Sequence, residues 1–243
     1  MQAFKNTEVT LLKPGLIEYG KAWDWQESVL KEVVKIKVDN RSLLPEDQVP
    51  TPNFLIFCRH PNVFTLGKSG HEENLLADAD FMAARDAVFF KSNRGGDITY
   101  HGPGQLVGYP ILDLENFFTD IHKYMRYLEE VIILTCAEYG LNAGRVDGQT
   151  GVWVDGMRKI CAFGVRTSRW VTMHGFALNI NTDLSYFSMI VPCGITDKGV
   201  TSLQNELGRY IDEAETEKIV LQKFEQVFGM KIKEGISPDV VPV

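Results

Sequence analysis

The sequence predicts an α+β fold in which a mostly antiparallel sheet is flanked by helices. Strand-like segments gather in the middle of the 243-residue chain and do not alternate regularly with helical ones, as they would in a doubly wound fold. Asp155 and Gly156 form a dipeptide typical of a tight β-hairpin turn. An apolar content of 44% over this length is enough to bury the core of one large domain.

The first half of the chain predicts short elements separated by turns. In order, these are a helix over 22–38, a loop over 41–53, strands over 54–60 and 63–68, a short helix over 78–87 and a strand over 88–93. Three prolines mark the loop, and Pro61 with Asn62 forms the turn between the two strands.

The second half predicts a strand, a helix, a three-stranded meander and a final helix. The strand covers 105–114, and Thr119 is the expected N-cap of a helix that ends at Gly140. The apolar stripe of this helix comprises Ile121, Tyr124, Met125, Leu128, Val131 and Ile132. The meander covers 151–181, with its second turn expected at 167–169, and the last helix covers 213–229.

Composition excludes several classes of protein. A net charge of −7 argues against a nucleic-acid-binding protein, and no run of 18 apolar residues predicts a membrane span. The chain lacks a secretory signal and a CxxC motif, so we expect a reduced, cytoplasmic protein with buried thiols. Its five histidines lack HxH and HxxxH spacing, and we expect no metal or other cofactor.

The most unusual segment is NRGGDITYHGPGQL, residues 93–106, which lies between two strand-like stretches. Its glycines permit positive φ angles and a close approach of ligand to backbone, and Arg94 and His101 bracket its first turn and the strand that follows this turn. It does not match a P-loop or a dinucleotide-binding fingerprint, because a strand follows where those motifs open a helix. The alternative interpretation is a pair of structural turns with a structural histidine.

Two further residues are candidates for chemistry. Lys159 lies in MRKICAFGV after the predicted hairpin turn, and its side chain can point to either face of the strand. Cys193 lies between Pro192 and Gly194, a turn context that leaves a thiol accessible. Taken alone, such a lysine is usually a solvated charge and such a cysteine is usually inert.

Together these segments resemble the lipoyl/octanoyl transferase family, whose members move an octanoyl group from acyl carrier protein to lipoyl domains. The signature RGGDITYHGPGQLVGYPILDL is present in full at 94–114, and RHPNVFTLGKSGHEENLL precedes it. GVWVDGMRKICAFGVR, TMHGFALNIN and IVPCGI follow in the family's order. The resemblance covers about residues 50–205. It implies one catalytic domain over 1–243, with the fold of the biotin and lipoate protein ligases.

The resemblance also implies roles for residues. Cys193 is the implied nucleophile and Lys159 its partner, either as an ammonium that stabilises the thiolate or as a neutral base. The implied acyl pocket comprises Arg94, Gly95, Gly96, Asp97, Ile98, Thr99, Tyr100, His101, Ala162, Phe163, Gly164, Gly175, Phe176 and Ala177. Cys161 departs from the small apolar residue common in relatives, and it would place a second thiol near the site.

The implied partners are octanoyl-acyl carrier protein as donor and, as acceptors, the lipoyl domains of 2-oxoacid dehydrogenase complexes and the glycine cleavage H protein. We expect the basic stretch around Arg145, Arg158, Arg166 and Arg169 to help dock the acidic carrier protein; a solvated face is the alternative. Competing functions are an ATP-dependent ligase of the same fold, an octanoyl amidotransferase, and a silent acyl-binding module. Lys159 with Cys193 favours the transferase over the ligase, since an acyl-adenylate mechanism needs no cysteine.

Overall fold

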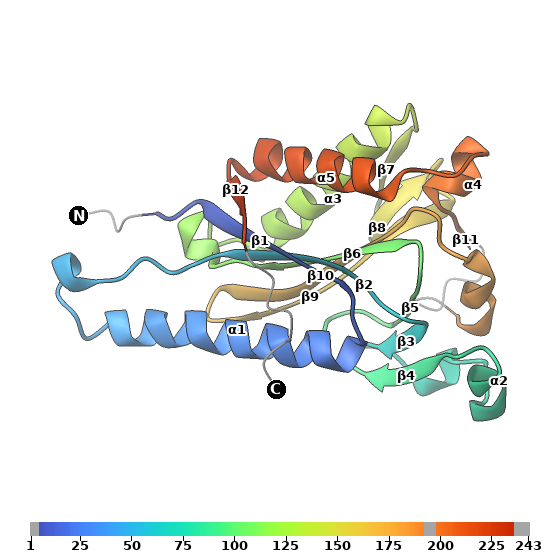
Figure 1. The fold of residues 1–243 in the computed structure, drawn as a ribbon, viewed down its shortest axis with the longest axis horizontal. Coiled ribbons are helices and arrows are strands. Elements are labelled where there is room, and N and C mark those ends of the chain that lie inside the picture. The colour runs from blue at the N-terminus through green and yellow to red at the C-terminus, as the bar shows by residue number, and fades with distance from the viewer. Residues whose placement is uncertain (1–4, 192–197, 236–243) are drawn as a thin grey trace.

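The computed structural model describes residues 5–191 and 198–235, and its architecture is built on a large, mostly antiparallel sheet (Figure 1). Within the described residues, the strand order is β12-β1-β2-β6-β10-β9-β8-β7, and β11 pairs with β9 off this path. The strands are β1 Glu8–Leu16, β2 Phe54–Arg59, β6 Gln105–Ile111, β7 Ala143–Val146, β8 Gln149–Val154, β9 Arg158–Ser168, β10 Val171–Asn179, β11 Gly199–Val200 and β12 Lys231–Glu234. In the described part of this sheet, the parallel pairs are β1–β12, β1–β2 and β11–β9.

A second, smaller sheet carries part of the glycine-rich segment. It comprises β3 Val63–Leu66, β4 Val88–Lys91 and β5 Ile98–His101, in the order β4-β3-β5. Strand β3 pairs parallel to β4 and antiparallel to β5. The glycine-rich segment is therefore not a simple turn, because its second half is itself a strand.

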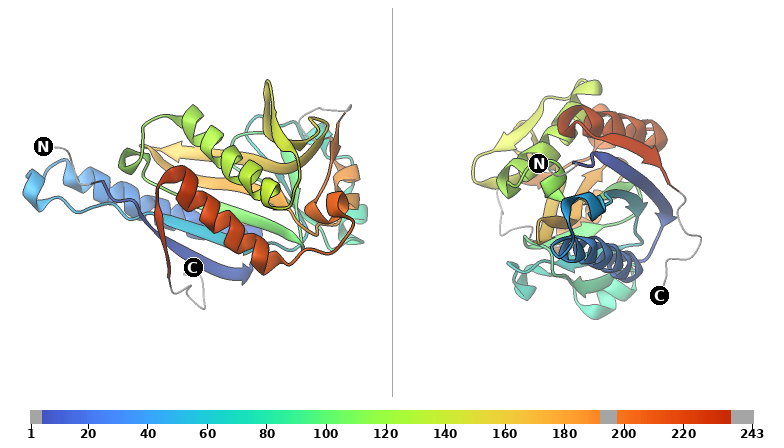
Figure 2. Two further views of the ribbon diagram at one scale, coloured as in Figure 1. Left: turned by 90° about the horizontal axis from the view of Figure 1, so that it is seen from above. Right: turned by 90° about the vertical axis from the view of Figure 1, so that its left-hand side faces the viewer.

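Helices cover both faces of the large sheet. The described helices are α1 Tyr19–Asn40, α3 Ile121–Glu138, α4 Leu203–Leu207, α5 Glu213–Phe228 and the short α2 Ala79–Ala83, which packs through Met82 against the core of the small sheet. Figure 2 shows α3 and α5 side by side on one face and α1 on the other. Along β6 the faces alternate: Leu106 packs in the cluster under α3 and α5, whereas Val107 and Tyr109 pack with α1.

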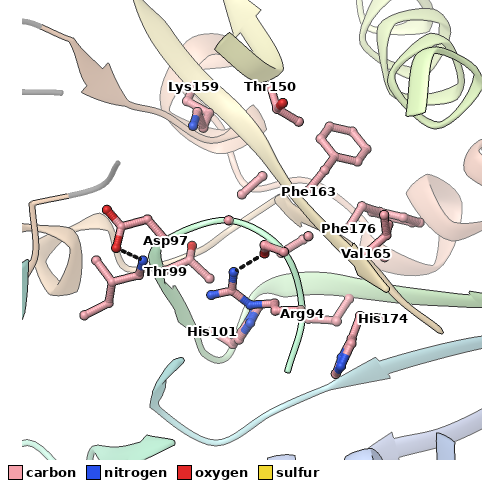
Figure 3. Close-up of a pocket in the computed structure, with 18 of the residues that line it drawn as sticks. Arg94, Asp97, Thr99, His101, Thr150, Lys159, Phe163, Val165, His174 and Phe176 are labelled. Carbon is pink, nitrogen blue, oxygen red and sulfur yellow. Dashed lines mark hydrogen bonds between the residues drawn. The ribbon is translucent and has the colours of Figure 1, made fainter. Parts of the chain in front are cut away.

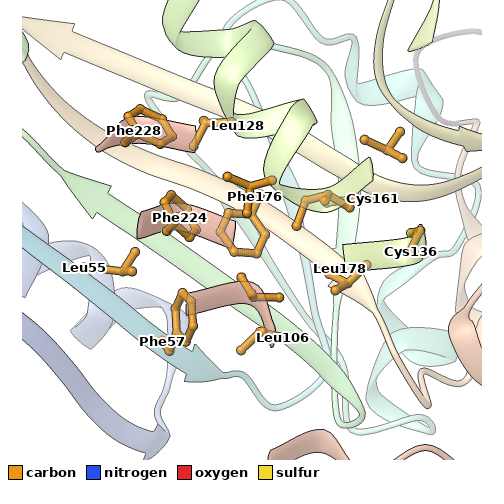
Figure 4. Packing of buried hydrophobic residues seen from close by; sticks show 14 of the residues in the cluster. Leu55, Phe57, Leu106, Leu128, Cys136, Cys161, Phe176, Leu178, Phe224 and Phe228 are labelled. Carbon is orange, nitrogen blue, oxygen red and sulfur yellow. The ribbon is translucent and has the colours of Figure 1, made fainter. Parts of the chain in front are cut away.

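The core under α3 and α5 is rich in aromatic rings (Figure 4). Phe176 of β10 lies between Phe57 and Phe224, with ring centroids 6.1 and 5.9 Å away. All three rings are at most 3% exposed. This packing holds the ring of Phe176, which also lines the cavity described below.

The predicted α+β fold is confirmed, with local corrections. Asp120, not Thr119, caps α3, because its carboxylate accepts the amide of Lys123. The Asp155–Gly156 turn is confirmed, with φ of 51° and 68°. The next turn is centred on Arg169 and Trp170, not on 167–169, because β9 continues to Ser168 and both turn residues adopt positive φ. Along the described chain, no helix is long and apolar enough to cross a membrane.

Candidate functional site

A cavity of about 650 Å³ lies between the glycine-rich segment and the face of the large sheet formed by β6, β9 and β10 (Figure 3). Of the predicted site residues, it is lined by Arg94, Gly95, Gly96, Asp97, Ile98, Thr99, His101, Lys159, Ala162, Phe163, Gly164, Gly175, Phe176 and Ala177. The structure thus brings together segments that are far apart in the sequence. A volume of this size is in the usual range for a small-molecule site.

Tyr100 is the exception among the predicted lining residues. Alternation along β5 turns it away from the side that Thr99 and His101 present to the cavity. Its ring stacks on Tyr186, with centroids 4.7 Å apart, and its hydroxyl donates to Asn62 Oδ1 at 2.8 Å. We therefore correct its assignment: Tyr100 belongs to the core of the small sheet.

The glycines at the centre of the cavity are explained by the close approach of neighbouring backbone segments. The amide of Gly95 donates to the carbonyl of Val165 at 2.9 Å, which attaches the glycine-rich segment to β9. A Cβ on Gly164 would lie 2.8 Å from the carbonyl oxygen of Gly95, and one on Gly175 would lie 2.1 Å from that of Gly108. Glycine is required at both positions, because neither backbone oxygen can rotate away.

Arg94 holds the glycine-rich segment in place. Its guanidinium donates to the carbonyl of Gly95 at 3.0 Å and to Thr65 Oγ1 at 2.9 Å. The side chain is buried yet lines the cavity, so it brings a fixed positive charge to the wall. The structure places Arg94 as a clamp between the small sheet and the site.

His101 is a neutral, oriented ring. Gln105 donates through Nε2 to Asn179 Oδ1 at 2.9 Å, so its Oε1 faces His101 Nδ1 at 2.9 Å and accepts from it. Burial lowers the pKa of His101 well below its ordinary value. The ring is therefore uncharged at neutral pH, and Gln105 fixes its tautomer.

Lys159 faces the cavity because of a β-bulge. Trp153 of β8 pairs with Lys159, but the next β8 residue, Val152, pairs with Cys161, which leaves Ile160 as an extra residue in β9. Ile160 and Cys161 consequently both pack in the core, and Lys159 shares a face with Ala162. Its Nζ lies 4.6 Å from the centroid of the Trp153 ring.

Cys193 lies outside the described residues, but the chain on both sides of it is anchored at the cavity. The amide of Val191 donates to the carbonyl of Asn74 at 2.8 Å, and Asn74 Nδ2 donates to Asp97 Oδ2 at 2.7 Å. On the other side, Val200 pairs with Lys159 in the β11–β9 ladder and also lines the cavity.

The other three cysteines are buried and free. Cys161 packs in the core under α3 and α5 and does not line the cavity. Burial raises its pKa well above the ordinary value and raises that of Cys136 to about 12. The expectation that Cys161 places a second thiol at the site is therefore wrong in geometry, because the bulge turns it to the core.

The basic stretch that was expected to dock the carrier protein is largely engaged in ion pairs within the protein. Arg145 pairs with Glu129 and Glu130. Arg158 pairs with Asp155 and Glu206, and Arg166 pairs with Glu27. Three of the four arginines therefore already have carboxylate partners within the protein, and they do not form an uncompensated basic surface.

Sequence patterns missed part of the lining. Tyr19, Gln105, Tyr109 and His174 line the cavity as well, from α1, β6 and β10. His174 has a φ of 56°, which is rare for a residue with a side chain. Burial lowers its pKa to about 3, so the ring is neutral.

Comparison with known proteins places the chain in a family. The family model of the lipoyl protein ligase A/B catalytic domain matches residues 18–225. An octanoyltransferase of Christiangramia forsetii is 55% identical over 233 residues, which cover 94% of this chain and 99% of that protein.

Solved structures at lower identity show the same fold. Lipoate-protein ligase A bound with ATP matches with a TM-score of 0.69 at 18% identity, over 96% of this chain and 90% of that one. A lipoate protein ligase from Thermoplasma acidophilum, described with its E2 lipoyl domain, matches at 0.68 and 20%, over 96% and 88%. The ligase-like fold is thereby confirmed. The chain belongs to the lipoyl protein ligase A/B catalytic-domain family and, within it, to the octanoyltransferases.

Proposed function

We propose that the protein transfers an octanoyl group from octanoyl-acyl carrier protein to a lysine of a lipoyl domain, through a thioester on Cys193. This is the first step of endogenous protein lipoylation. The acceptors would be the lipoyl domains of 2-oxoacid dehydrogenase complexes and the glycine cleavage H protein. The 55% identity to an octanoyltransferase over nearly its whole length supports the reaction class.

One observation carries the proposal: Lys159 stands at a cavity whose neighbouring walls are small or apolar. Ala162, Gly164, Gly175 and Ala177 leave room beside β9 and β10, and Phe176 adds an apolar wall. Both chain segments that flank 192–197 are bonded at this cavity, one beside Asp97 and the other at Lys159.

The chemistry proceeds in two balanced steps. The Cys193 thiol gives up its proton as its sulfur attacks the carbonyl of the donor thioester and a new C–S bond forms. The C–S bond to the carrier then breaks, and the carrier's sulfur leaves as a thiol by taking up that proton. The neutral amine of the acceptor lysine then attacks the enzyme thioester, the amide bond forms, and the Cys193 sulfur leaves as the amine gives up its proton. Covalent catalysis of this kind divides one difficult transfer into two easier ones.

Lys159 supports the first step by its charge. A free cysteine has a pKa near 8.5, and a nearby ammonium stabilises the thiolate and lowers that value. The Lys159 ammonium lies on the Trp153 ring rather than in bulk solvent, so its field is less screened than that of a surface lysine. The transfer draws on the donor thioester and needs neither ATP nor another cofactor.

The whole chain would act as one catalytic domain in the cytoplasm. The hydrophobic cluster under α3 and α5 supports a single domain, because it joins β1, near the N-terminus, to β10 and α5. A cytoplasmic location is supported by the buried free thiols of Cys58, Cys136 and Cys161, since reducing compartments preserve such thiols.

The test is a reconstituted transfer. Purified protein, octanoyl-acyl carrier protein and an apo lipoyl domain are mixed without ATP, and the lipoyl domain is weighed by mass spectrometry. We expect it to gain one octanoyl group. Transfer that requires ATP and free octanoate, with ATP–pyrophosphate exchange, would instead identify a ligase.

A further inference from the structure

The two ends of the cavity differ in chemistry. Figure 3 shows Lys159 and Thr150 at one end, His101 and His174 at the other, and Phe163 and Phe176 between them. The end away from Lys159 is closed by polar side chains, among which the Arg94 guanidinium is charged and the tyrosines and histidines are neutral. Tyr109 Oη donates to His60 Nε2 at 2.7 Å, and Tyr19 Oη donates to Ser92 Oγ at 2.9 Å, so both hydroxyl protons are used within the protein.

His174 holds a buried, unpartnered hydrogen-bond acceptor at this end. Its Nε2 lies 2.7 Å from Asn93 Oδ1, and Asn93 Nδ2 donates to Glu27, so the amide is oriented and Nε2 carries the proton. Nδ1 is consequently an acceptor, and it has no partner among the described residues although the side chain is 1% exposed. A buried acceptor without a partner is costly, and it favours any ligand group that can donate to it.

The distance along β10 matches the acyl chain. Three residues separate Ala177 from His174, which corresponds to about 10 Å at ~3.3 Å per residue. An extended chain of eight carbons advances ~1.25 Å per C–C bond and so spans about 9 Å over its seven bonds, close to this distance. Ala177 pairs with Ala162, on the Lys159 side of the cavity, and His174 pairs with Val165. An octanoyl group whose carbonyl lies near Ala162 therefore ends at His174.

We infer that His174 is the specificity-determining residue that ends the acyl pocket, and that it selects by both size and polarity. The inference rests on the proposed acyl transfer. Methylenes beyond the eighth carbon must displace or bury the imidazole, whereas in a purely apolar pocket each would improve binding about fourfold. An acyl chain that carries a terminal hydroxyl can donate to Nδ1, so ω-hydroxyacyl thioesters form a second substrate class.

The experiment compares donors on wild type and two variants. Octanoyl, nonanoyl, decanoyl, dodecanoyl and ω-hydroxyoctanoyl thioesters of acyl carrier protein are each assayed for kcat/KM. His174→Gly removes the ring and suits the positive φ, and His174→Asn keeps a polar side chain that tolerates this conformation. Trp170→Gly is the matched control, because Trp170 also has a positive φ, of 66°, yet is exposed and lies outside the cavity lining.

We expect wild type to prefer octanoyl to decanoyl at least tenfold and to transfer ω-hydroxyoctanoyl at least fivefold faster than nonanoyl, which has the same length. His174→Gly should raise the decanoyl-to-octanoyl ratio at least tenfold and remove the hydroxyl advantage. His174→Asn should shift the ratio less, and Trp170→Gly should leave it unchanged.

If octanoyl transfer proceeds but the ratio in both His174 variants stays at the wild-type value, the inference is overturned. If wild type does not transfer octanoyl at all, the proposed function fails instead. If His174→Gly does not fold, the decanoyl-to-octanoyl ratio of His174→Asn decides, and its melting temperature shows that this variant is folded.

Discussion

Replacing Gly164 by alanine tests whether the close contact between β9 and the glycine-rich segment builds the site. The new Cβ would lie 2.8 Å from the carbonyl oxygen of Gly95, about 0.6 Å short of the 3.4 Å of ordinary contact. The Cδ of Arg94 would be only 2.9 Å away. The glycine-rich segment must therefore move off the strand, and the hydrogen bond from Gly95 to Val165 must lengthen.

Overpacking of this kind costs about 1–3 kcal/mol of folding free energy. For a chain of about this size, each kcal/mol lowers the melting temperature by roughly 2–4 °C. Because a displacement of about 1 Å at a site can cost a hundredfold in rate, we expect kcat/KM for octanoyl transfer to fall at least tenfold.

The assay pairs thermal unfolding with the rate of octanoyl transfer, and Gly144→Ala is the control. A Cβ added to Gly144, in β7, would meet no atom within 4 Å, and this glycine does not have a positive φ. Alanine there should therefore change stability by less than ~0.5 kcal/mol. A Gly164→Ala enzyme with wild-type melting temperature and wild-type transfer would refute the reasoning.

Three other predictions concern charge. Lys159→Ala should slow acylation and raise the pH at which iodoacetamide alkylates Cys193, because loss of an ammonium destabilises the thiolate. A slower enzyme whose alkylation of Cys193 depends on pH as in wild type would show that Lys159 acts as a base instead. Burial lowers the pKa of His60 to about 4 and that of His174 to about 3. Below pH ~6.5 the unfolded chain therefore binds more protons than the folded protein. The free energy of unfolding should fall as the pH drops from there toward 4, by up to ~1.4 kcal/mol per pH unit for each histidine. Urea unfolding at pH 7, 6 and 5 measures this, and equal midpoints would contradict it. Arg145→Ala should destabilise the protein by about 1–3 kcal/mol, because it removes a partner of the fully buried Glu129 carboxylate. Arg169→Ala, at an exposed turn, should be neutral, and equal melting temperatures for the two variants would contradict the prediction.

The sequence predicted the elements whose signals are local. Helices α1, α3 and α5 and the hairpin at Asp155–Gly156 follow from apolar periodicity and turn chemistry. Strands β1 and β12 were not predicted, because they form a parallel edge between segments more than 200 residues apart. Such pairing depends on long-range contacts that no local pattern contains.

The sequence predicted which segments form the site, but it did not predict the direction of every side chain. The glycine-rich segment was identified, yet Tyr100 points to the small sheet and Cys161 to the core. The direction of Lys159 depends on one extra residue in β9, and a bulge has no signature in a run such as MRKICAFGV. His174 was overlooked because its positive φ and open acceptor arise only from the folded β10.

The central claim is that Cys193 carries the octanoyl group between donor and acceptor. The direct measurement is the intact mass of the protein mixed with octanoyl-acyl carrier protein in the absence of acceptor, followed by peptide mapping. We predict one octanoyl adduct on Cys193 that hydroxylamine removes, that is absent in Cys193→Ser and that persists in Cys161→Ala. An adduct on Cys161, or full transfer activity in Cys193→Ser, would contradict the account.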